Sequence, residues 1–392
     1  MITVSRRADR LTPTAINRLL GDVRRVQAQG TSVVSLMRGE PDFPTPTHIS
    51  DAAVDALRRG RTTYPDNRGE VRLREAVAIK LQRDNAVPAD PQSEVLVTTG
   101  ATLGLHTALL ALLDEDDEVL VPDPVYDAYH SPIVLAGGRP VRVVAPVVAD
   151  RFVLDLDALD AAATPRTKVL LLNTPWNPVG TVFTPAEIAA IGEFAVRRNL
   201  AILSDEIYET IVFDGRRHVS PASVSAEVRD RTVLVNSLSK TYAMPGWRVG
   251  YCRAPAHVID AMLLVLQQSS RGPATFIQDA AAAALTGPQD AVEEMRRGYA
   301  ARRQQVVEAL GGIPRVRVLP PEGGFFAMVD VRQTGRPSND VRLHLLEQHG
   351  VAVAHGAAYG AGGEGTLRVS FASGGDNLSR GLERLRAGLL SL

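Results

Sequence analysis

The chain has 392 residues, and at roughly 150 residues per domain this length predicts two or three domains with large buried cores. The 43 Lys and Arg residues nearly balance the 44 Asp and Glu residues, and a net charge of −1 argues against a sequence-independent attraction to nucleic acid or acidic lipid. Apolar residues make up 45% of the chain and charged residues 22%, which is typical of a globular protein.

The cysteine content and the N-terminus predict the compartment. The single cysteine, Cys252, excludes an internal disulfide and a Cys-based zinc site. The eight histidines lack the spacing of a zinc site, so we expect no bound metal. The first ten residues lack the apolar stretch of a secretory signal, and no apolar run approaches the roughly 18–20 residues of a membrane helix. We therefore expect a soluble cytoplasmic protein.

Over the first three quarters of the chain, short β-rich apolar runs alternate with helical patterns. The expected strands are residues 94–97, 118–121, 141–145, 168–172, 201–203, 232–235 and 248–252. The expected helices between them are residues 102–113, 126–136, 156–163 and 185–198. This alternation predicts an α/β domain with three layers, in which helices cover both faces of a mainly parallel sheet.

From about Pro288 the pattern becomes that of a smaller α+β domain. The expected elements are a long helix at 291–310, strands at 316–319 and 325–331, a helix at 339–348, strands at 351–354 and 366–371, and a terminal helix from Asn377. We therefore expect a large domain over residues 45–287 and a small C-terminal domain over residues 288–392. Residues 1–44 precede the regular alternation, and we expect them to form an N-terminal arm that packs on the small domain.

One glycine-rich segment matches a nucleotide motif without its structural context. Residues 360–365 have the G-x-G-x-x-G spacing of loops that bind dinucleotide phosphates. Such a loop needs a following helix whose N-terminus faces the phosphates, whereas residues 366–371 alternate like a strand. We therefore interpret the segment as a surface turn, with nucleotide binding as the unfavoured alternative.

Three polar segments each follow directly after one of the expected central strands. They are residues 173–180 (Asn-Thr-Pro-Trp-Asn-Pro-Val-Gly), 205–208 (Asp-Glu-Ile-Tyr) and 237–240 (Ser-Leu-Ser-Lys). Ligands of such sheets bind beyond the carboxyl ends of the strands, so we expect these segments to meet in one crevice together with Arg248. Considered alone, Lys240 is more simply explained as a surface charge, and only its neighbours favour a functional role.

Seven short segments, taken in order, form a larger pattern. They are residues 39–43, Tyr64 with Gly69, and residues 173–180, 204–208, 237–240, 246–251 and 367–371. Together they resemble the class I/II aminotransferases, which are fold-type-I enzymes that use pyridoxal phosphate (PLP). The resemblance spans almost the whole chain. It implies this fold and the transfer of an α-amino group from an L-amino acid to a 2-oxo acid, with pyridoxamine phosphate as the amino-carrying form of the cofactor.

The resemblance implies catalytic roles for Lys240, Asp205 and Tyr208. Lys240 would form the Schiff base with PLP and move the proton at the substrate α-carbon, because a neutral lysine amine is both nucleophilic and basic. Asp205 would keep the pyridine nitrogen protonated, which makes the ring a stronger electron sink. Tyr208 and Asn177 would hydrogen-bond the phenolic oxygen of the ring.

The resemblance also implies a phosphate site at the start of the helix expected from Thr102. Gly100, Ala101 and Thr102 would offer backbone amides and the positive end of the helix dipole. Ser237 and Arg248 would add a hydroxyl group and a permanent cation. Taken alone, Gly100 is slightly better explained as a simple tight turn.

Further residues are implied around the cofactor and the substrate. Tyr126 would stack on the cofactor ring, and Tyr64 would reach the phosphate from a neighbouring subunit, so the implied enzyme is a homodimer. Arg368 would bind the substrate α-carboxylate with its planar fork, beside Gly39 and Asn177. The simpler alternatives are a core aromatic at position 126 and a solvent-facing arginine on the strand.

The substrate side chain and the reaction type stay open. Trp176, Phe43 and Phe325 either line an apolar wall for a bulky substrate or pack in the core, and Arg271 either binds a second polar group or lies on the surface. Enzymes that catalyse β- or γ-elimination, replacement or cyclisation can retain all of these residues, so they are the alternative to the favoured transamination. A PLP-binding regulator is the remote alternative.

Overall fold

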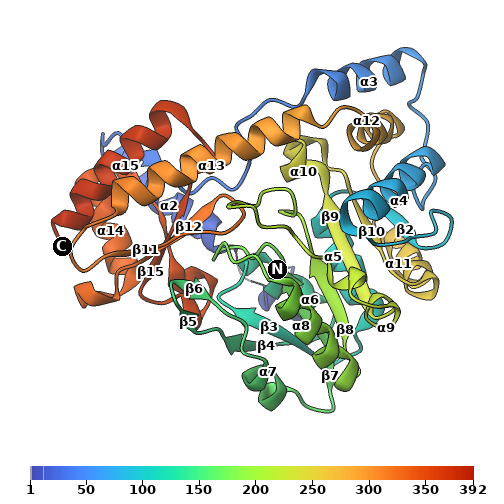
Figure 1. Ribbon diagram of the computed structural model, residues 1–392, viewed down its shortest axis with the longest axis horizontal. Helices are drawn as coiled ribbons and strands as arrows, with labels where there is room; N and C mark the ends of the chain where they lie inside the picture. Colours follow the sequence, from blue (N-terminus) through green and yellow to red (C-terminus); the bar gives the residue numbers. More distant parts are fainter. Residues whose placement is uncertain (1, 12) are drawn as a thin grey trace.

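The computed structural model describes residues 2–11 and 13–392, and within these ranges it contains a seven-stranded sheet in the order β2-β10-β9-β8-β7-β3-β4 (Figure 1). The strands are β2 (Val95–Thr98), β3 (Glu118–Asp123), β4 (Arg139–Val144), β7 (Thr167–Asn173), β8 (Ala201–Asp205), β9 (Thr232–Ser237) and β10 (Gly250–Arg253). β10 is antiparallel to both of its neighbours, and the other neighbouring pairs are parallel. The expected mainly parallel sheet is confirmed.

Helices cover both faces of this sheet because successive strand residues point to opposite sides. In β7, Val169 and Leu171 pack with one face, whereas Leu170 and Leu172 pack with the other. The first face is covered by α5 (Ala101–Leu112), α6 (His130–Leu135) and α11 (Ala256–Ser269). The second face is covered by α4 (Val71–Asn85), α7 (Leu156–Ala162), α8 (Pro185–Arg197) and α12 (Thr275–Thr286), with α3 (Thr47–Arg58) packed on α12. The result is the expected three-layer α/β/α domain.

A smaller α+β domain is built on an antiparallel sheet of four strands in the described chain, in the order β11-β12-β15-β14. These strands are β11 (Arg317–Leu319), β12 (Phe326–Asp330), β14 (Ala354–His355) and β15 (Thr366–Ser370). The helices that share their core are α13 (Asp290–Leu310), α14 (Ser338–His349) and α15 (Gly375–Leu390). Figure 1 shows α13 running from the large domain across to the small one.

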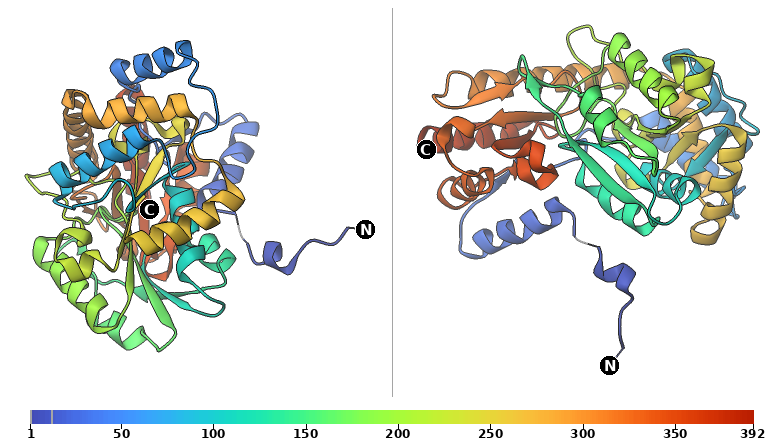
Figure 2. Two further views of the ribbon diagram at one scale, coloured as in Figure 1. Left: turned by 90° about the vertical axis from the view of Figure 1, so that its right-hand side faces the viewer. Right: turned by 90° about the horizontal axis from the view of Figure 1, so that it is seen from below.

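The N-terminal segment contacts both domains. After α1 (Arg6–Asp9) and α2 (Ala15–Ala28), strand β1 (Val34–Ser35) pairs in parallel with β13 (Val351–Ala352) of the small domain. At the other end of the segment, the backbone N–H of Ala15 donates to Asp127 of the large domain. Figure 2 shows residues 2–11 extending away from the body of the molecule. The domain boundaries themselves stay a prediction, and residues 1 and 12 of the predicted arm lie outside the described ranges.

The remaining short elements lie in the connections. They are the hairpin β5 (Val147–Val148) with β6 (Arg151–Phe152), the helices α9 (Ala226–Arg229) and α10 (Leu238–Thr241), and the 3₁₀ turns η1 (Asp127–Tyr129), η2 (Pro221–Ser223), η3 (Pro245–Trp247), η4 (Arg332–Thr334), η5 (Gly356–Tyr359) and η6 (Ala361–Gly363). In the described ranges, no helix is both long and apolar enough to cross a membrane.

Three expected elements differ from the structure. The strand expected from Arg248 begins at Gly250, because Arg248 follows a 3₁₀ turn in the left-handed conformation with φ 54°. The helix expected at 126–136 is divided into η1 and α6. Pro132 lacks an N–H group, so it is tolerated only in the first turn, and α6 starts at His130. The strand expected at 351–354 is divided between β13 and β14, which pair with different sheets.

Candidate active site

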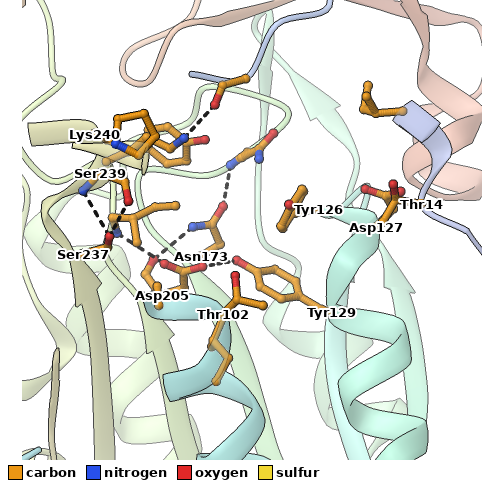
Figure 3. Close-up of a pocket in the computed structure, with 18 of the residues that line it drawn as sticks. Thr14, Thr102, Tyr126, Asp127, Tyr129, Asn173, Asp205, Ser237, Ser239 and Lys240 are labelled. Carbon is orange, nitrogen blue, oxygen red and sulfur yellow. Dashed lines mark hydrogen bonds between the residues drawn. The ribbon is translucent and has the colours of Figure 1, made fainter. Parts of the chain in front are cut away.

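A cavity of about 400 Å³ opens at the carboxyl ends of β7, β8 and β9 (Figure 3). It brings together most residues expected at the site, namely Gly39, Ala101, Thr102, Tyr126, Asn177, Asp205, Tyr208, Ser237, Lys240, Arg248 and Arg368. The N-terminal segment and the small domain complete its walls with Ile16 and Phe326. The crevice predicted at the strand ends is therefore present, and it lies where all three parts of the chain meet.

Asp205 ends β8 at the base of the cavity and is only 2% exposed. The hydroxyl group of Tyr129 donates to its Oδ2 at 2.6 Å, and the backbone N–H of Ile207 donates to its Oδ1 at 3.3 Å. Burial raises the pKa of the Asp205 carboxyl to about 6, and these two hydrogen bonds partly oppose the rise. The carboxylate is thus held in one orientation and can ionise near neutral pH.

Asn173 and Asn177 support this carboxylate from the end of β7. The side-chain amide of Asn173 donates to the backbone carbonyl of Asp205 at 3.0 Å, and its Oδ1 accepts the backbone N–H of Asn177 at 2.7 Å. The side chain of Asn177 lines the cavity, and its Oδ1 is buried without a hydrogen-bond partner within the described chain. A buried amide oxygen without a partner is costly, so this position favours a bound polar group.

Lys240 lies in the short helix α10, directly after β9. Its ammonium group donates to the backbone carbonyl of Gly39 at 2.6 Å, which ties the large domain to the N-terminal segment. Burial lowers the pKa of Lys240 to about 8, against the opposing charges of Glu40 and Asp205. A substantial fraction of the amine is therefore neutral just above neutral pH, which is the form that attacks a carbonyl group.

The part of the cavity at the start of α5 is suited to an anion. Helix α5 begins there after Gly100, which has φ 78°, and a Cβ atom at this position would lie 2.6 Å from Nη2 of Arg248. Arg248 is held by a 3.0 Å bond from Nη1 to the carbonyl of Pro245. Ser237 donates to Ser239 at 2.8 Å, and both hydroxyl groups lie at the cavity wall. Helix amides, hydroxyl groups and a guanidinium together form a phosphate-type donor set.

Arg368 projects from β15 at the small-domain side of the cavity. Its guanidinium carbon lies 4.0 Å from the ring centre of Phe326 and 4.8 Å from that of Tyr359, so two aromatic rings enclose it. Nη2 donates to the carbonyl of Met37 at 3.1 Å, whereas Nε is buried without a partner within the described residues. A buried cation with an unused donor is suited to a carboxylate ligand.

The proposed apolar wall is not part of the cavity. Trp176 is buried in the core and stacks on Phe183 at 5.8 Å, and Phe43 packs edge-on against Tyr299 at 5.3 Å. Phe325 is also buried in the small-domain core, 5.7 Å from the Lys240 ammonium. Large aromatic residues fill cores as readily as binding sites, and packing is the role that the structure gives to these three.

Of the other expected residues, Gly100 precedes α5 but is not part of the cavity lining, and Arg271 and Tyr64 lie away from it. Arg271 is exposed and reaches Asn67 at 3.4 Å. Tyr64 is 88% exposed and is not among the described residues that line the cavity.

Several cavity residues were not predicted from the sequence. Tyr129 holds Asp205, and its only signal was its position three residues after Tyr126 in a turn rich in aromatic residues. Ile16 and Asn17 come from the N-terminal segment, more than 150 residues from the central motifs, and no pattern in the sequence places them there. Phe326 was passed over in favour of its neighbour Phe325.

A three-layer α/β/α domain with a small α+β domain, and a lysine and a buried carboxylate at the carboxyl ends of its parallel strands, define a fold-type-I enzyme. The chain matches the model of the family "Aminotransferase class I and II" over residues 31–385, and it belongs to this family.

Similar proteins cover almost the whole chain. It is 38% identical over 388 residues to aromatic-amino-acid aminotransferase 2 of Thermococcus litoralis, covering 98% of this chain and 97% of that one. It is 39% identical over 389 residues to a probable aspartate/prephenate aminotransferase of Aquifex aeolicus, covering 98% of both. The solved aspartate aminotransferase of Rhizobium meliloti superposes with a TM-score of 0.95 at 34% identity, covering 99% of both chains. The chain is therefore an aminotransferase, and PLP is the cofactor of its family.

Proposed function

We propose that the chain transfers the α-amino group of an L-amino acid to a 2-oxo acid with PLP bound between Asp205, Lys240 and the start of α5. The observation that carries this proposal is that three kinds of group line one cavity: a carboxylate that ionises near neutral pH, an amine with a lowered pKa, and a set of anion-binding donors. When bound, PLP supplies an aldehyde that takes up the amino group and a protonated ring that accepts an electron pair.

The residues of the chain have separate tasks in this proposal. Asp205, oriented by Tyr129, holds a proton at the pyridine nitrogen. Lys240 provides the amine that binds the aldehyde, and its neutral form moves a proton at the substrate α-carbon. The Gly39 carbonyl, which accepts a hydrogen bond from the Lys240 ammonium, keeps this group over the cavity. Tyr208 lines the same wall and faces the phenolic oxygen of the ring.

The remaining groups bind the phosphate of PLP and the α-carboxylate of the substrate. The amides of Ala101 and Thr102, the Ser237 hydroxyl and the Arg248 guanidinium hold the phosphate, and Tyr126 covers the ring. Arg368 binds the α-carboxylate of either substrate through the donor that is unused in the structure, beside Gly39 and the Asn177 amide. Because one cavity holds both the amino donor and the acceptor in turn, the same arginine serves both half-reactions.

The small number of lysines allows a direct test of the cofactor site. The chain contains three lysines, at positions 80, 168 and 240, and of these Lys80 is buried in an ion pair while Lys168 is exposed on β7. After incubation with PLP and borohydride reduction, peptide mass spectrometry should find the added mass on Lys240. Lys240→Ala should lose the label, whereas the control Lys168→Ala should keep it. A label on Lys168 alone would refute the assignment.

The stoichiometry of the reaction separates transamination from its alternatives. With an amino acid and no acceptor, an aminotransferase releases one 2-oxo acid per site and stops. A second 2-oxo acid should then restart the release. Continued formation of ammonia or of a cyclic product without any acceptor would show elimination or cyclisation instead. A gel shift with DNA would favour the regulator.

We further propose that the enzyme is a homodimer in which Tyr64 completes the partner's phosphate site. Two features support this. Tyr64 is almost fully exposed, and a shallow groove with Trp247, Phe276 and Ile277 adjoins the cavity through Pro245, which lines both. A second copy seated on this groove would lie beside the active site.

Light scattering should give twice the 42.1 kDa mass of one chain. Mixing the inactive variants Lys240→Ala and Tyr64→Ala should restore activity, because one of the two sites in each mixed dimer is intact. A monomeric active enzyme would refute both points.

We also propose that the enzyme works in the cytoplasm. The support is chemical: the single cysteine, Cys252, is fully buried and has no second cysteine with which to form a disulfide, as is usual in a reducing compartment. Cell fractionation tests this proposal, and recovery in a secreted or periplasmic fraction would contradict it.

A further inference from the structure

The glycine-rich segment 360–365 closes around a carboxylate of the chain itself. Asp123 ends β3 and is only 1% exposed. Its Oδ2 accepts the backbone N–H of Ala361 at 3.2 Å, and its Oδ1 accepts the backbone N–H of Gly362 at 3.1 Å. Successive backbone amides form an anion-binding concavity here, as they do in phosphate loops, but the anion is a side chain 238 residues away in sequence.

The spacing of the glycines follows from this contact. Gly360 has φ 134°, and a Cβ atom there would lie 2.0 Å from Oδ1 of Asp123. A Cβ atom at Gly362 would lie 2.5 Å from the backbone oxygen of Asp123. Both positions therefore need glycine because the turn approaches Asp123 so closely, and two of the three glycines of the motif are explained without a nucleotide.

Two further hydrogen bonds join the same segments. The carbonyl of Tyr359 accepts the backbone N–H of Val125 at 3.0 Å and Nη1 of Arg142 at 3.0 Å. The same nitrogen of Arg142 lies 3.6 Å from Oδ2 of Asp123. We call this set of contacts between residues 123–125 and 359–362 the clasp.

Each side of the clasp continues directly into the active site. On the large-domain side, Tyr126 lines the cavity and Tyr129 holds Asp205. On the small-domain side, the Tyr359 ring lies against Arg368, and β15, which carries Arg368, starts at Thr366. The clasp therefore links the group expected to bind the substrate carboxylate to the groups expected to hold the cofactor ring.

We propose that Asp123 is a positioning residue whose clasp keeps Arg368 in register with Asp205 and Lys240, an inference that rests on the proposed function. Arg368 is otherwise held by a single hydrogen bond, to Met37, and by its two aromatic neighbours, as far as the described chain shows. One of those neighbours is Tyr359, whose backbone is part of the clasp. Opening the clasp would loosen the Tyr359 ring from Arg368, so the arginine would lose one of its two aromatic contacts while the domain cores stay folded.

The test compares Asp123→Asn with Asp116→Asn. The first variant keeps the side-chain volume but removes the charge and one acceptor. The control removes an exposed carboxylate, paired with Arg139, just before the other end of the same strand. In Asp123→Asn we expect KM for both the amino acid and the 2-oxo acid to rise between about tenfold and a hundredfold, with a smaller change in kcat. The control should change neither constant.

A second readout needs neither cofactor nor activity. In the cofactor-free chain, amide hydrogen exchange of residues 359–363 and 125–129 should accelerate together in Asp123→Asn and stay unchanged in the control. Gly360→Ala opens the clasp from the other side and should reproduce both effects. Gly335→Ala is its control, since Gly335 also has a positive φ, of 74°, but its Cβ atom would meet no neighbour.

The outcomes separate the two proposals. Faster exchange with unchanged KM would show a purely structural clasp and overturn the positioning role. Unchanged exchange in both Asp123→Asn and Gly360→Ala would show that the clasp does not link the segments, and it would also overturn the inference. If the wild-type enzyme itself releases ammonia without an acceptor, the proposed transamination is wrong. The comparisons of amide exchange and of KM for the amino acid would still test the positioning role of Asp123.

Discussion

Tyr129→Phe tests how the buried carboxylate of the site is tuned. The substitution removes one hydroxyl group and keeps the ring, so it deletes the 2.6 Å hydrogen bond to Asp205 with little change in packing. Burial already raises the pKa of Asp205 to about 6, and the Tyr129 hydroxyl opposes this rise by stabilising the ionised form. Without that donor, the pKa of Asp205 should rise further.

The size of the shift follows from the strength of the lost bond. Hydrogen bonds to charged groups contribute about 1.5–3 kcal/mol, and one pKa unit corresponds to about 1.4 kcal/mol. The pKa of Asp205 in the cofactor-free chain should therefore rise by about one to two units. In the folded chain the pKa of Asp205 already exceeds its value in the unfolded chain. The free energy of unfolding therefore falls as the pH rises from the unfolded-state pKa to the folded-state pKa. In the variant this interval extends to higher pH.

The assay is the affinity of the cofactor-free chain for PLP as a function of pH. Affinity should increase as Asp205 ionises, in wild type around pH 6, and in Tyr129→Phe about one to two units higher. Comparing the two proteins at each pH cancels the ionisation of PLP itself. The acid limb of this affinity profile therefore reports the ionisation of Asp205 before the cofactor is bound.

Tyr242→Phe is the matched control. It also removes a buried phenol that donates a hydrogen bond, to Gln289 at 2.9 Å, but it lies outside the cavity. Its affinity profile should coincide with that of the wild type. An unmoved acid limb in Tyr129→Phe, or an equal shift in Tyr242→Phe, would refute the role assigned to the Tyr129 hydroxyl.

Three further substitutions test the phosphate end, the carboxylate site and the buried charges. Gly100→Ala should weaken PLP binding at least about tenfold, because its Cβ atom would lie 2.6 Å from Nη2 of Arg248 and would displace this guanidinium, while Gly335→Ala should bind PLP normally, as fluorescence titration would show. Arg368→Lys should raise KM for both substrates about tenfold to a hundredfold, because the lysine cannot form the paired hydrogen bonds of the planar fork. Lys80→Met leaves the buried Glu209 unpaired and should lower the free energy of unfolding in urea by about 3–5 kcal/mol. Although burial alone would raise the pKa of Glu209, the Lys80 pair holds it below its usual value, so this loss should shrink as the pH falls through that pKa.

The central strands could be predicted because their burial leaves a clear signal. A parallel strand covered on both faces carries a continuous apolar run, such as residues 201–203 in β8 and 233–235 in β9, and such runs stand out from amphipathic helices. The helix α4 was missed for the opposite reason. Its inner face buries Arg74 and Lys80, two cations that interrupt the apolar stripe by which a helix is recognised. The position of β10 between β2 and β9 depends on pairing between distant segments, and no local pattern encodes it.

The site, like the fold, has parts that a local sequence pattern predicts and parts that depend on contacts between distant segments. The residues at the carboxyl ends of β7, β8 and β9 could be placed in one crevice, because parallel strands end at the same edge of a sheet. For Trp176 and Phe325 the sequence left both roles open, because aromatic character alone does not separate a core from a cavity wall. Ile16 and Asn17 reach the cavity through the path of the whole N-terminal segment, which depends on the pairing of β1 with the small domain.

The glycine-rich segment 360–365 shows why a motif needs its partner to be interpreted. Its local chemistry was readable: closely spaced glycines allow backbone amides to converge on an anion, whatever that anion is. The strand expected after the turn is present at Thr366–Ser370, where a dinucleotide-binding loop would require a helix. The sequence could not identify Asp123 as the anion, since that contact exists only after β3 and β15 have reached their places in two different sheets. Amide exchange at this turn in Asp123→Asn therefore measures a long-range contact that local patterns could not predict.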